Sequence, residues 1–360
     1  MDRIKELEGL ITKARNDYYN SQPTVSDAVF DAWVDELKSI DPENKAVTAI
    51  GAPVVQSEWK KVKHKIPMGS LNKVNTPDEF ADWAKCANGG SFLVCEKLDG
   101  LSIELVYDDG KLIEAVTRGS GEIGEDIYSN VSRMIGVKDV KLNDFSGSIR
   151  GEIILTKTNH KKYFPEYSNP RNAASGISKR LDGEGSEHLS VLVYQVAGGE
   201  EFETEVKQFK WLKSKGLKTP QFNHIGNISD VTSYWRKYQD ELRKDVDYDT
   251  DGLVVRVNDL GKQRQLGEKD LRPRGQTAWK FDNQCMESIL LDVLWEVGNS
   301  GRVTPIAVIK PVFICGAEIK RINLHNLSIF NSLKLWKGCR VLVSRRNDVI
   351  PYLEENLDYV

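Results

Sequence analysis

Six short apolar segments between residues 92 and 257 constrain the fold more than any other feature of this chain. They span residues 92–95, 102–107, 112–117, 148–155, 191–196 and 253–257, and each has the length of a β-strand. Helical periodicity separates only some of them, over residues 206–215 and 229–243. Because a sheet of βαβ units needs a crossover helix between successive parallel strands, this order predicts an α+β domain.

The flanking sequence predicts two further domains. In the first 40 residues, Ile4, Leu7 and Ile11 recur at helical spacing, and a second helical pattern follows the capping pair Ser26-Asp27. Residues 41–65 read as a linker, and short strands alternate with turns after residue 290, as in a small β-barrel. We therefore predict an α+β multidomain protein with a helical domain over residues 1–60, an α+β domain over 61–288 and a barrel over 289–360.

Composition excludes several classes of protein. Hydrophobic content of 40% and charged content of 29% in 360 residues are ordinary for a globular protein and argue against disorder. The five cysteines are scattered, without Cys-x-x-Cys spacing, so we expect neither a disulfide framework nor a structural zinc site. No signal peptide or membrane-spanning apolar run is present, and we expect a cytoplasmic protein that does not bind membranes. Net charge is −3, but residues 291–353 carry nine Lys/Arg against four Asp/Glu, and such a basic module can grip phosphates.

Lys97 is the strongest candidate for chemistry. It lies in Glu96-Lys97-Leu98-Asp99-Gly100, between two strand-like segments, and has the setting of an amine nucleophile. Such a lysine reacts only when neutral, so we expect nearby cations or burial to lower its pKa. A surface lysine at a turn is the structural alternative.

A glycine-rich loop follows at residues 117–126 and contains Gly119-x-Gly121-x-x-Gly124. This spacing also satisfies the dinucleotide fingerprint of a Rossmann fold, which normally opens the first βαβ unit. Here two helices and three strands precede the loop, which argues against that interpretation. A plain tight turn is the other alternative.

Charged residues recur inside the later apolar segments. Arg150-Gly151-Glu152 interrupts one strand, Asp251 precedes another in which Arg256 is embedded, and Lys280 stands between aromatic residues. Charges in such positions cost free energy unless they line a site or pair with one another. Together with Lys97 they supply a nucleophile, cations for phosphates and carboxylates for a divalent metal, which is the inventory of nucleotidyl transfer.

The ordered motifs resemble those of the NAD⁺-dependent DNA ligases over nearly the full length of the chain. The motifs that carry the resemblance are Lys97-Leu98-Asp99-Gly100, residues 117–126, Arg150-Gly151-Glu152, residues 169–175, residues 251–257 and Trp279-Lys280-Phe281. Residues 298–305, 324–326 and 345–351 resemble that family's oligonucleotide-binding (OB) barrel. The resemblance implies a helical domain that binds nicotinamide mononucleotide, a nucleotidyltransferase domain and an OB fold.

This resemblance implies self-adenylation of Lys97 from NAD⁺, transfer of AMP to a 5′-phosphate at a nick in duplex DNA, and joining to the 3′-hydroxyl. The implied catalytic residues are Lys97, Asp99, Arg118, Glu152 and Lys280. Those implied to bind the cofactor are Tyr18, Tyr19, Asp27, Phe30, Asp31, Ser70, Leu71, Glu96, Arg118, Glu152, Tyr194, Asp251, Val254, Arg256 and Lys280. Mg²⁺ or Mn²⁺ would lie at Glu152 and Asp251, and DNA at Arg171, Lys179, Arg302, Arg345 and Arg346.

Two alternatives remain. An ATP-dependent ligase or capping enzyme shares the Lys-x-Asp-Gly pattern, but the amino-terminal segment around Tyr18–Asp31 argues for NAD⁺. A nick-binding or adenylating subunit with little sealing activity of its own is the other. This alternative is suggested because the family's zinc-finger, helix-hairpin-helix and BRCT modules do not follow residue 360 in the sequence. A shortened chain, a minimal ligase and one subunit of a split enzyme are all consistent with that observation.

Five positions depart from the family pattern. Cys95 stands where the family has an acid two residues before its nucleophile, with Glu96 beside it. The other departures are Phe30 for tyrosine, Arg256 for lysine, Lys179 for arginine and Asn299 for arginine.

Overall fold

The computed structural model describes residues 2–20, 25, 27–42, 44–48, 58–88, 90–281, 285–297, 303–314, 317–346 and 350–359. These residues form two compact units, one from Met1–Thr24 and Val34–Phe281 and the other from Val25–Trp33 and Asp282–Val360. We describe each unit by itself. No helix in the described part is both long and apolar enough to cross a membrane.

The two predicted amino-terminal helices are confirmed as α1 (Asp2–Asn20) and α2 (Asp27–Ile40). Leu7 and Ile11 are fully buried, as their helical spacing predicts. Arg3 ties the helices together through two hydrogen bonds of 2.7 and 2.6 Å from its guanidinium to the Glu36 carboxylate. The expected linker over residues 41–65 is only partly irregular, because α3 (Lys45–Thr48) and β1 (Lys61–Lys63) lie within it.

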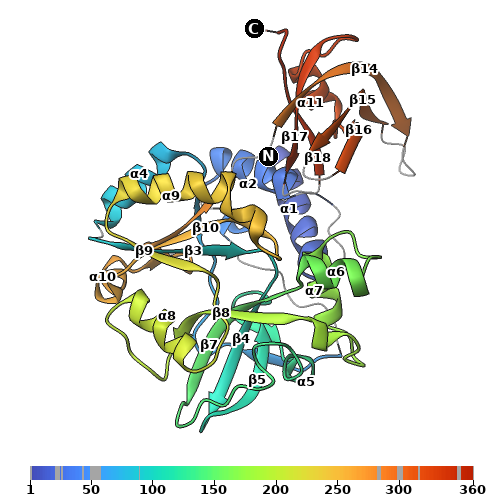
Figure 1. Cartoon of the computed structure of the whole chain (residues 1–360). Helices are drawn as coiled ribbons and strands as arrows, with labels where there is room; N and C mark the ends of the chain where they lie inside the picture. The colour runs from blue at the N-terminus through green and yellow to red at the C-terminus, as the bar shows by residue number, and fades with distance from the viewer. Residues whose placement is uncertain are drawn as a thin grey trace. The chain divides into compact units, whose positions relative to one another are not determined.

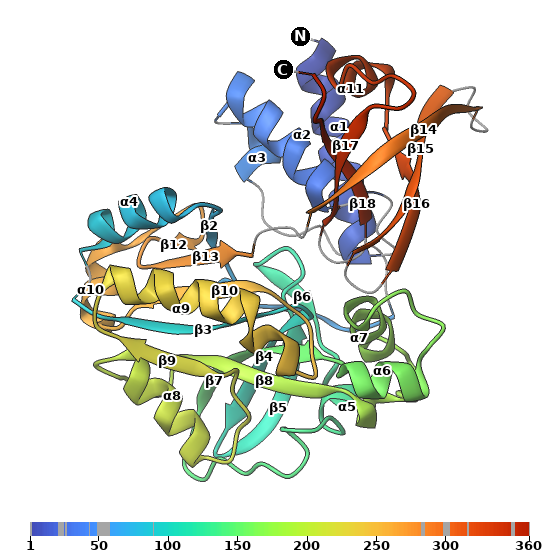
Figure 2. The same ribbon diagram turned by 45° about the horizontal axis from the view of Figure 1, so that its top comes forward.

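Two facing sheets build the α+β part of the first unit, as Figures 1 and 2 show. One sheet has the order β2-β13-β10-β3-β9 and the other β5-β4-β7-β8. The first contains β2 (Asn72–Val74), β3 (Phe92–Leu98), β9 (Phe222–Ile225), β10 (Thr250–Val257) and β13 (Gln276–Lys280). The second contains β4 (Leu101–Asp108), β5 (Lys111–Thr117), β7 (Gly147–Ile154) and β8 (Ser190–Ala197). All six predicted strands are therefore confirmed, and β3 extends far enough to include Lys97.

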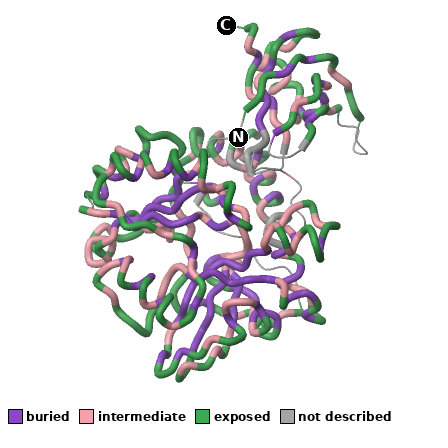
Figure 3. The backbone as a smooth tube through the Cα atoms, in the orientation of Figure 1, coloured by how far each residue is buried: buried purple, intermediate pink, exposed green. Residues whose placement is uncertain are grey.

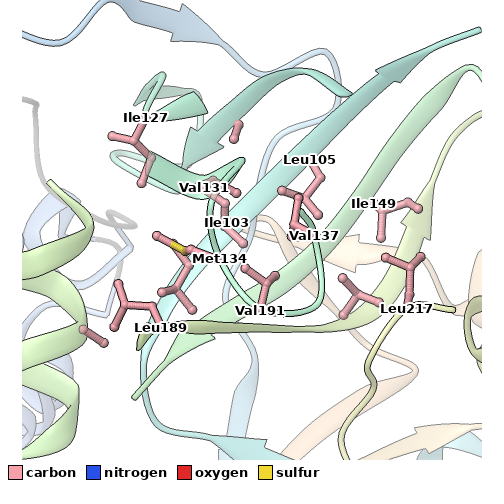
Figure 4. Packing of buried hydrophobic residues seen from close by; sticks show 14 of the residues in the cluster. Ile103, Leu105, Ile127, Val131, Met134, Val137, Ile149, Leu189, Val191 and Leu217 are labelled. Atoms are coloured by element: carbon pink, nitrogen blue, oxygen red, sulfur yellow. The ribbon is translucent and has the colours of Figure 1, made fainter. Parts of the chain in front are cut away.

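Three apolar layers fix these sheets. Helices α4 (Pro77–Ala87) and α9 (Ile228–Asp240) cover the outer face of the first sheet, where Phe80 and Trp235 stack on Trp279. The outer face of the second sheet packs a larger core, shown in Figure 4, against α5 (Tyr128–Val131) and α7 (Pro170–Ser178). Between the sheets, Leu98 meets Ile154 and Leu192. Figure 3 shows this burial running along the strands.

Shorter elements complete the first unit. They are β6 (Ile123–Glu125), α6 (Lys157–Tyr163), η1 (Ser186–His188), α8 (Glu205–Ser214), η2 (Leu242–Asp245), α10 (Leu260–Leu266), β11 (Glu268–Lys269) and β12 (Arg272–Pro273). The glycine-rich loop joins β5 to β6 rather than opening a helix, and β5 pairs antiparallel with β4. A Rossmann βαβ unit needs parallel strands, so the tight-turn interpretation is correct.

The second unit contains one curled antiparallel sheet with the order β16-β15-β14-β17-β18. Its elements are β14 (Cys285–Val297), β15 (Val303–Ile314), β16 (Ala317–Asn323), α11 (Leu327–Ser332), β17 (Arg340–Arg346) and β18 (Ile350–Asn356). The long β14 pairs with β17 through its first part and with β15 through its second. The edge strands β16 and β18 approach one another around a core that includes Leu290, Ile309 and Val341. This is the predicted small barrel.

Candidate active site

Lys97 forms an ion pair with a residue 154 positions away in the sequence. Its Nζ lies 2.8 and 2.7 Å from the two carboxylate oxygens of Asp251. Strand pairing brings them together, because Gly252 of β10 lies opposite Lys97 of β3 on one side and opposite Lys280 of β13 on the other. Three strands thus place a lysine, an aspartate and a second lysine side by side.

The charges around Lys97 oppose our expectation for its pKa. Burial lowers the pKa of Lys97, but the carboxylates of Asp251, Asp99 and Glu152 raise it by more, and the net direction is upward. The prediction of a lowered pKa is therefore wrong for this arrangement, because acids outweigh cations near the amine. Burial acts upward on the pKa of Asp251, yet Lys97, Lys280 and Arg171 together hold it below its usual value.

Asp99 and Arg171 form a second ion pair beside the first. The Arg171 Nη1 lies 2.5 Å from the Asp99 Oδ1. Arg171 belongs to the first turn of α7, whose start is fixed by Asn169: its side chain accepts a hydrogen bond from the Asn172 backbone N–H. Burial lowers the pKa of Arg171, although Asp251 opposes this. We had expected Arg171 at DNA, and the structure places it within the charged group around Lys97.

Glu152 approaches the same group from the other sheet. Its Oε2 accepts a hydrogen bond of 2.9 Å from Ser102 Oγ on β4. Burial raises the pKa of Glu152 to about 7, against the opposing effects of Ser102, Arg118 and Lys97. Gly100 permits this approach, because a Cβ there would lie 2.1 Å from the Ile153 carbonyl oxygen. This close packing explains the glycine of the Lys-x-Asp-Gly motif.

We call Lys97, Asp99, Glu152, Arg171 and Asp251 the lysine cluster. Its Glu152 and Asp251 fit an oxygen-preferring divalent cation, since both are carboxylates of the cluster and burial raises the pKa of Glu152, an effect that a bound cation would oppose. Among the residues that the structure describes, no three His, Cys, Asp or Glu side chains converge as a ready-made metal site. Any cation here would therefore need ligands from a bound molecule or water as well.

An apolar cluster adjoins Lys97 on the same face of β3. It contains Leu71, Leu93, Cys95, Tyr194, Val206, Phe209, Phe222 and Val254. Leu71, Tyr194 and Val254 were predicted to bind the cofactor, and the structure brings these three together. Burial raises the pKa of Cys95 to about 11, so this thiol stays protonated.

Arg256 lies buried behind the Tyr194 ring. Its Nη1 donates to the Tyr194 carbonyl oxygen at 3.1 Å, and its guanidinium carbon is 5.6 Å from the ring centroid. Glu205 of α8 pairs with it at 3.5 Å, and the two side chains are only 1% and 4% exposed. Sequence analysis missed Glu205, because an acid in the first turn of a helix after Thr204 looks like ordinary capping.

Glu96 requires a correction. Successive side chains of a strand point to opposite faces, so Glu96 lies on the face of β3 away from Lys97. Its carboxylate accepts hydrogen bonds from the Tyr238 hydroxyl, from the Tyr248 hydroxyl at 2.5 Å and from the Gln221 N–H at 2.8 Å. With 3% exposure and these partners, Glu96 braces the outer layer of helices and cannot reach a nucleotide beside Lys97.

The other predicted residues fall into three groups. Arg118 follows β5 near Glu152, whose pKa it helps to lower, and half-buried Ser70 lies between β1 and β2. Lys179 pairs with Glu125 at 3.0 Å, and half-buried Phe30 lies in α2. The side chains of Tyr18, Tyr19, Asp27, Asp31, Arg345 and Arg346, and residues Asn299 and Arg302 as a whole, lie outside the part that the structure describes.

Comparisons with known proteins agree with this geometry. The family model of the NAD-dependent DNA ligase adenylation domain matches residues 56–284, and that of the NAD-dependent DNA ligase OB-fold domain matches residues 287–358. A DNA ligase of Sorangium cellulosum (strain So ce56) is 44% identical over 379 residues, which cover 98% of this chain and 56% of that protein. A DNA ligase of Treponema denticola is 38% identical, with the same two coverages.

The chain thus spans a little over half the length of these relatives. A solved structure described as "DNA binding with a minimal scaffold: Structure-function analysis of Lig E DNA ligases" covers 81% of this chain and 98% of its own, at 10% identity and a TM-score of 0.45. The family assignment rests on the two models, of which the first alone matches more than half of the residues. Because an adenylation domain and an OB-fold domain of this family match in succession along the sequence, the chain belongs to the NAD-dependent DNA ligase family.

Proposed function

We propose that Lys97 is the nucleophile of an NAD⁺-dependent adenylation reaction. Its Nζ would attack the phosphorus next to adenosine, forming a phosphorus–nitrogen bond and expelling nicotinamide mononucleotide. The observation that carries this proposal is the pairing of Lys97 on β3 with Asp251 on the neighbouring β10, which lies next to Lys280 on β13, while Glu152 and Arg118 belong to the facing sheet. Placing charges around a transferring phosphoryl group is the main work of such an enzyme.

Lys97 must lose a proton before it attacks. The nearest acceptor is the Asp251 carboxylate at 2.7 Å, but the shifts of both pKa values favour the proton on the amine. A negatively charged substrate would further favour the protonated, positively charged form of Lys97. The proton is therefore lost more easily if the charge of the neighbouring carboxylates is neutralised. A Mg²⁺ or Mn²⁺ ion at Glu152 and Asp251 would neutralise charge there and on the phosphate.

The neighbouring residues supply binding and orientation. The Tyr194 ring offers a face for adenine, with Leu71 and Val254 beside it. Lys280 and Arg118 supply positive charge for the phosphates. We assign the nicotinamide half to the amino-terminal helices that carry Tyr18, Tyr19, Asp27, Phe30 and Asp31.

The later steps extend the same proposal. AMP would pass from Lys97 to the 5′-phosphate of nicked duplex DNA, and the 3′-hydroxyl would then displace AMP and seal the strand. Arg302, Arg345 and Arg346 of the OB domain, with Lys179, are proposed to contact DNA phosphates. A second candidate is an adenylating subunit that needs a partner for sealing; the chain spans 56% of the length of the two relatives named above.

Intact-mass measurement tests the first step. The purified chain is freed of bound AMP with nicotinamide mononucleotide and then incubated with Mg²⁺ and either NAD⁺ or ATP. We expect a gain of one adenylyl group with NAD⁺ only, absent in Lys97→Ala and retained in the exposed-lysine control Lys85→Ala. An adduct with ATP alone, or an adduct that persists in Lys97→Ala, would refute the assignment.

Sealing of a pre-adenylated nick separates the two candidates. A ligase that acts alone joins this substrate without help. A chain that becomes adenylated but leaves the nick open supports the subunit proposal.

A further inference from the structure

A second group of charged side chains is buried below the turn that carries Arg118. It consists of His64, between β1 and β2, Glu104 on β4 and Arg150 on β7, which are 4%, 2% and 8% exposed. None of them belongs to the lysine cluster. Burial of three ionisable groups is costly unless they serve one another or a site.

Both ring nitrogens of His64 face acceptors. Nδ1 contacts Oε2 of Glu104, and Nε2 lies 3.1 Å from the Thr117 carbonyl oxygen and 3.3 Å from that of Arg118. Carbonyl oxygens only accept hydrogen bonds, so Nε2 carries a hydrogen. If Glu104 is a carboxylate, Nδ1 must carry one too, and the ring is then an imidazolium.

Arg150 favours the ionised form of Glu104. Its Nη2 lies 4.0 Å from Oε1, the carboxylate oxygen that does not contact His64. The charged groups that surround the histidine ring are thus Glu104 from β4 and, behind it, Arg150 from β7, while the end of β5 turns two carbonyl oxygens toward the ring. A carboxylate at Glu104 would thus contact His64 through one oxygen and lie near the Arg150 guanidinium through the other.

The group fixes the turn after β5. The His64 N–H donates to the Glu122 carbonyl oxygen and the Met68 N–H to that of Gly121, both at 2.8 Å. Arg150 Nη2 donates to the carbonyl oxygens of Ile66 and Pro67 at 2.5 and 3.1 Å. Residues 64–68 are therefore joined on one side to the glycine-rich loop and on the other to the strand that carries Glu152.

Arg118 is the residue that this arrangement positions. Its N–H donates to the Ser102 carbonyl oxygen at 3.2 Å, while its own carbonyl oxygen faces His64. Ser102 in turn donates through its hydroxyl to Glu152, whose pKa Arg118 helps to lower. The orientation of the Arg118 backbone thus depends on hydrogen bonds at both ends. Its carbonyl oxygen accepts from the Gly121 N–H at 2.8 Å, and the N–H at His64 Nε2 adds a second contact at 3.3 Å.

We propose that His64 is a positioning residue, held as a buried imidazolium by Glu104, that orients Arg118 toward Glu152 for nucleotidyl transfer. This inference rests on the proposed function for its catalytic consequence, but not for the charge state of the ring. It predicts that replacing His64, or removing the partner that holds its ring, displaces Arg118 and slows adenylation of Lys97 without removing any group that touches the substrate.

Nitrogen-15 NMR of histidine-labelled protein tests the charge state. At pH 7 we expect both His64 ring nitrogens to carry a hydrogen and show imidazolium shifts, as the acceptors on both sides of the ring require. A neutral-tautomer signature for His64 at pH 7 in the folded protein would overturn the inference. In Glu104→Gln the hydrogen on Nδ1 should be lost, and in arginine-labelled protein the Nε–H signal of Arg118 should shift.

Adenylation kinetics test the positioning role. We expect His64→Gln and Glu104→Gln each to slow formation of the Lys97 adduct about 10- to 100-fold, the range that displacement of an aligned group produces. Combining either change with Arg118→Ala should add little, because both act through Arg118. His224→Gln, the matched control, should leave the rate unchanged.

Full additivity with Arg118→Ala, or a wild-type rate in a folded His64→Gln, would overturn the positioning role. If His64→Gln fails to fold, the adenylation rate of Glu104→Gln and the histidine spectra of the wild type test the positioning role instead. A wild-type chain that forms no adduct would refute the proposed function instead, and the ring and Arg118 signals would still decide whether His64 is charged and orients that residue.

Discussion

The buried pair of Glu205 and Arg256 offers a quantitative test of the structure. Glu205 Oε2 lies 3.5 Å from the Arg256 Nη1 and also accepts a hydrogen bond of 2.9 Å from Gln208. Its other oxygen accepts one of 2.8 Å from Gln263. Since both charged side chains are at most 4% exposed, water cannot replace the carboxylate once it is removed.

Glu205→Ala should therefore cost about 3–5 kcal/mol in the free energy of unfolding, the usual penalty for leaving one buried charge without its partner. Adding Arg256→Met removes the unpaired charge and should restore most of that loss. The matched control is Glu203→Ala, because Glu203 pairs with Lys207 while 80% exposed and its removal should leave stability nearly unchanged.

Urea unfolding followed by tryptophan fluorescence gives these free energies, with Trp235 and Trp279 buried in the same unit. Two outcomes would refute the reasoning. A loss below about 1 kcal/mol for Glu205→Ala would mean that the guanidinium finds water. A double variant as unstable as the sum of its single changes would mean that the two side chains do not interact.

Three further predictions concern Glu152, Glu96 and Gly100. Glu152 has a folded-state pKa raised from 4.5 to about 7, so ionisation weakens the fold as pH rises through this interval, by about 3 kcal/mol in total. Unfolding of the wild type and of Glu152→Gln at pH 4.5 and pH 8 should show this difference, and parallel pH dependences would contradict it. Glu96→Gln should destabilise the protein by about 1–3 kcal/mol, because it weakens the hydrogen bonds from the two tyrosines, but it should leave the rate of Lys97 adenylation unchanged. A large loss of rate in the folded variant would show that Glu96 does act in the active site. Gly100→Ala should lose about 1–3 kcal/mol, since its Cβ would lie 2.1 Å from the Ile153 oxygen, whereas Gly90→Ala, with nothing within 4 Å, should be neutral in the same urea assay.

Local sequence patterns predicted the elements of this protein well. Short continuous apolar segments predicted the strands on which Lys97, Glu152 and Asp251 stand, because burial on both faces of a sheet leaves a strong signal over few residues. The short helix α3 and strand β1 in the supposed linker were missed, since elements of three or four residues carry too little periodicity to detect.

The same patterns could not assign partners. Glu96 is adjacent to Lys97 in the sequence, yet β3 turns its side chain to the opposite face, where Tyr238 and Tyr248 bind it. Glu205 and His64 carried no signal at all, because their partners lie 51 and 40 residues away. Such contacts arise from strand register and helix packing, which depend on the whole chain.

The sequence alone indicated Lys97 as the candidate nucleophile, its glycine and aspartate neighbours and the resemblance to a ligase family, since each is written in consecutive residues or in the order of motifs. Only the tertiary structure decided which charges surround that lysine. Pairing of β3 with β10 joins Lys97 to Asp251, and the facing sheet adds Glu152, so the amine is surrounded by acids that raise its pKa. The pKa of a group depends on the distances to its neighbours in space, and those distances exist only once the chain has folded.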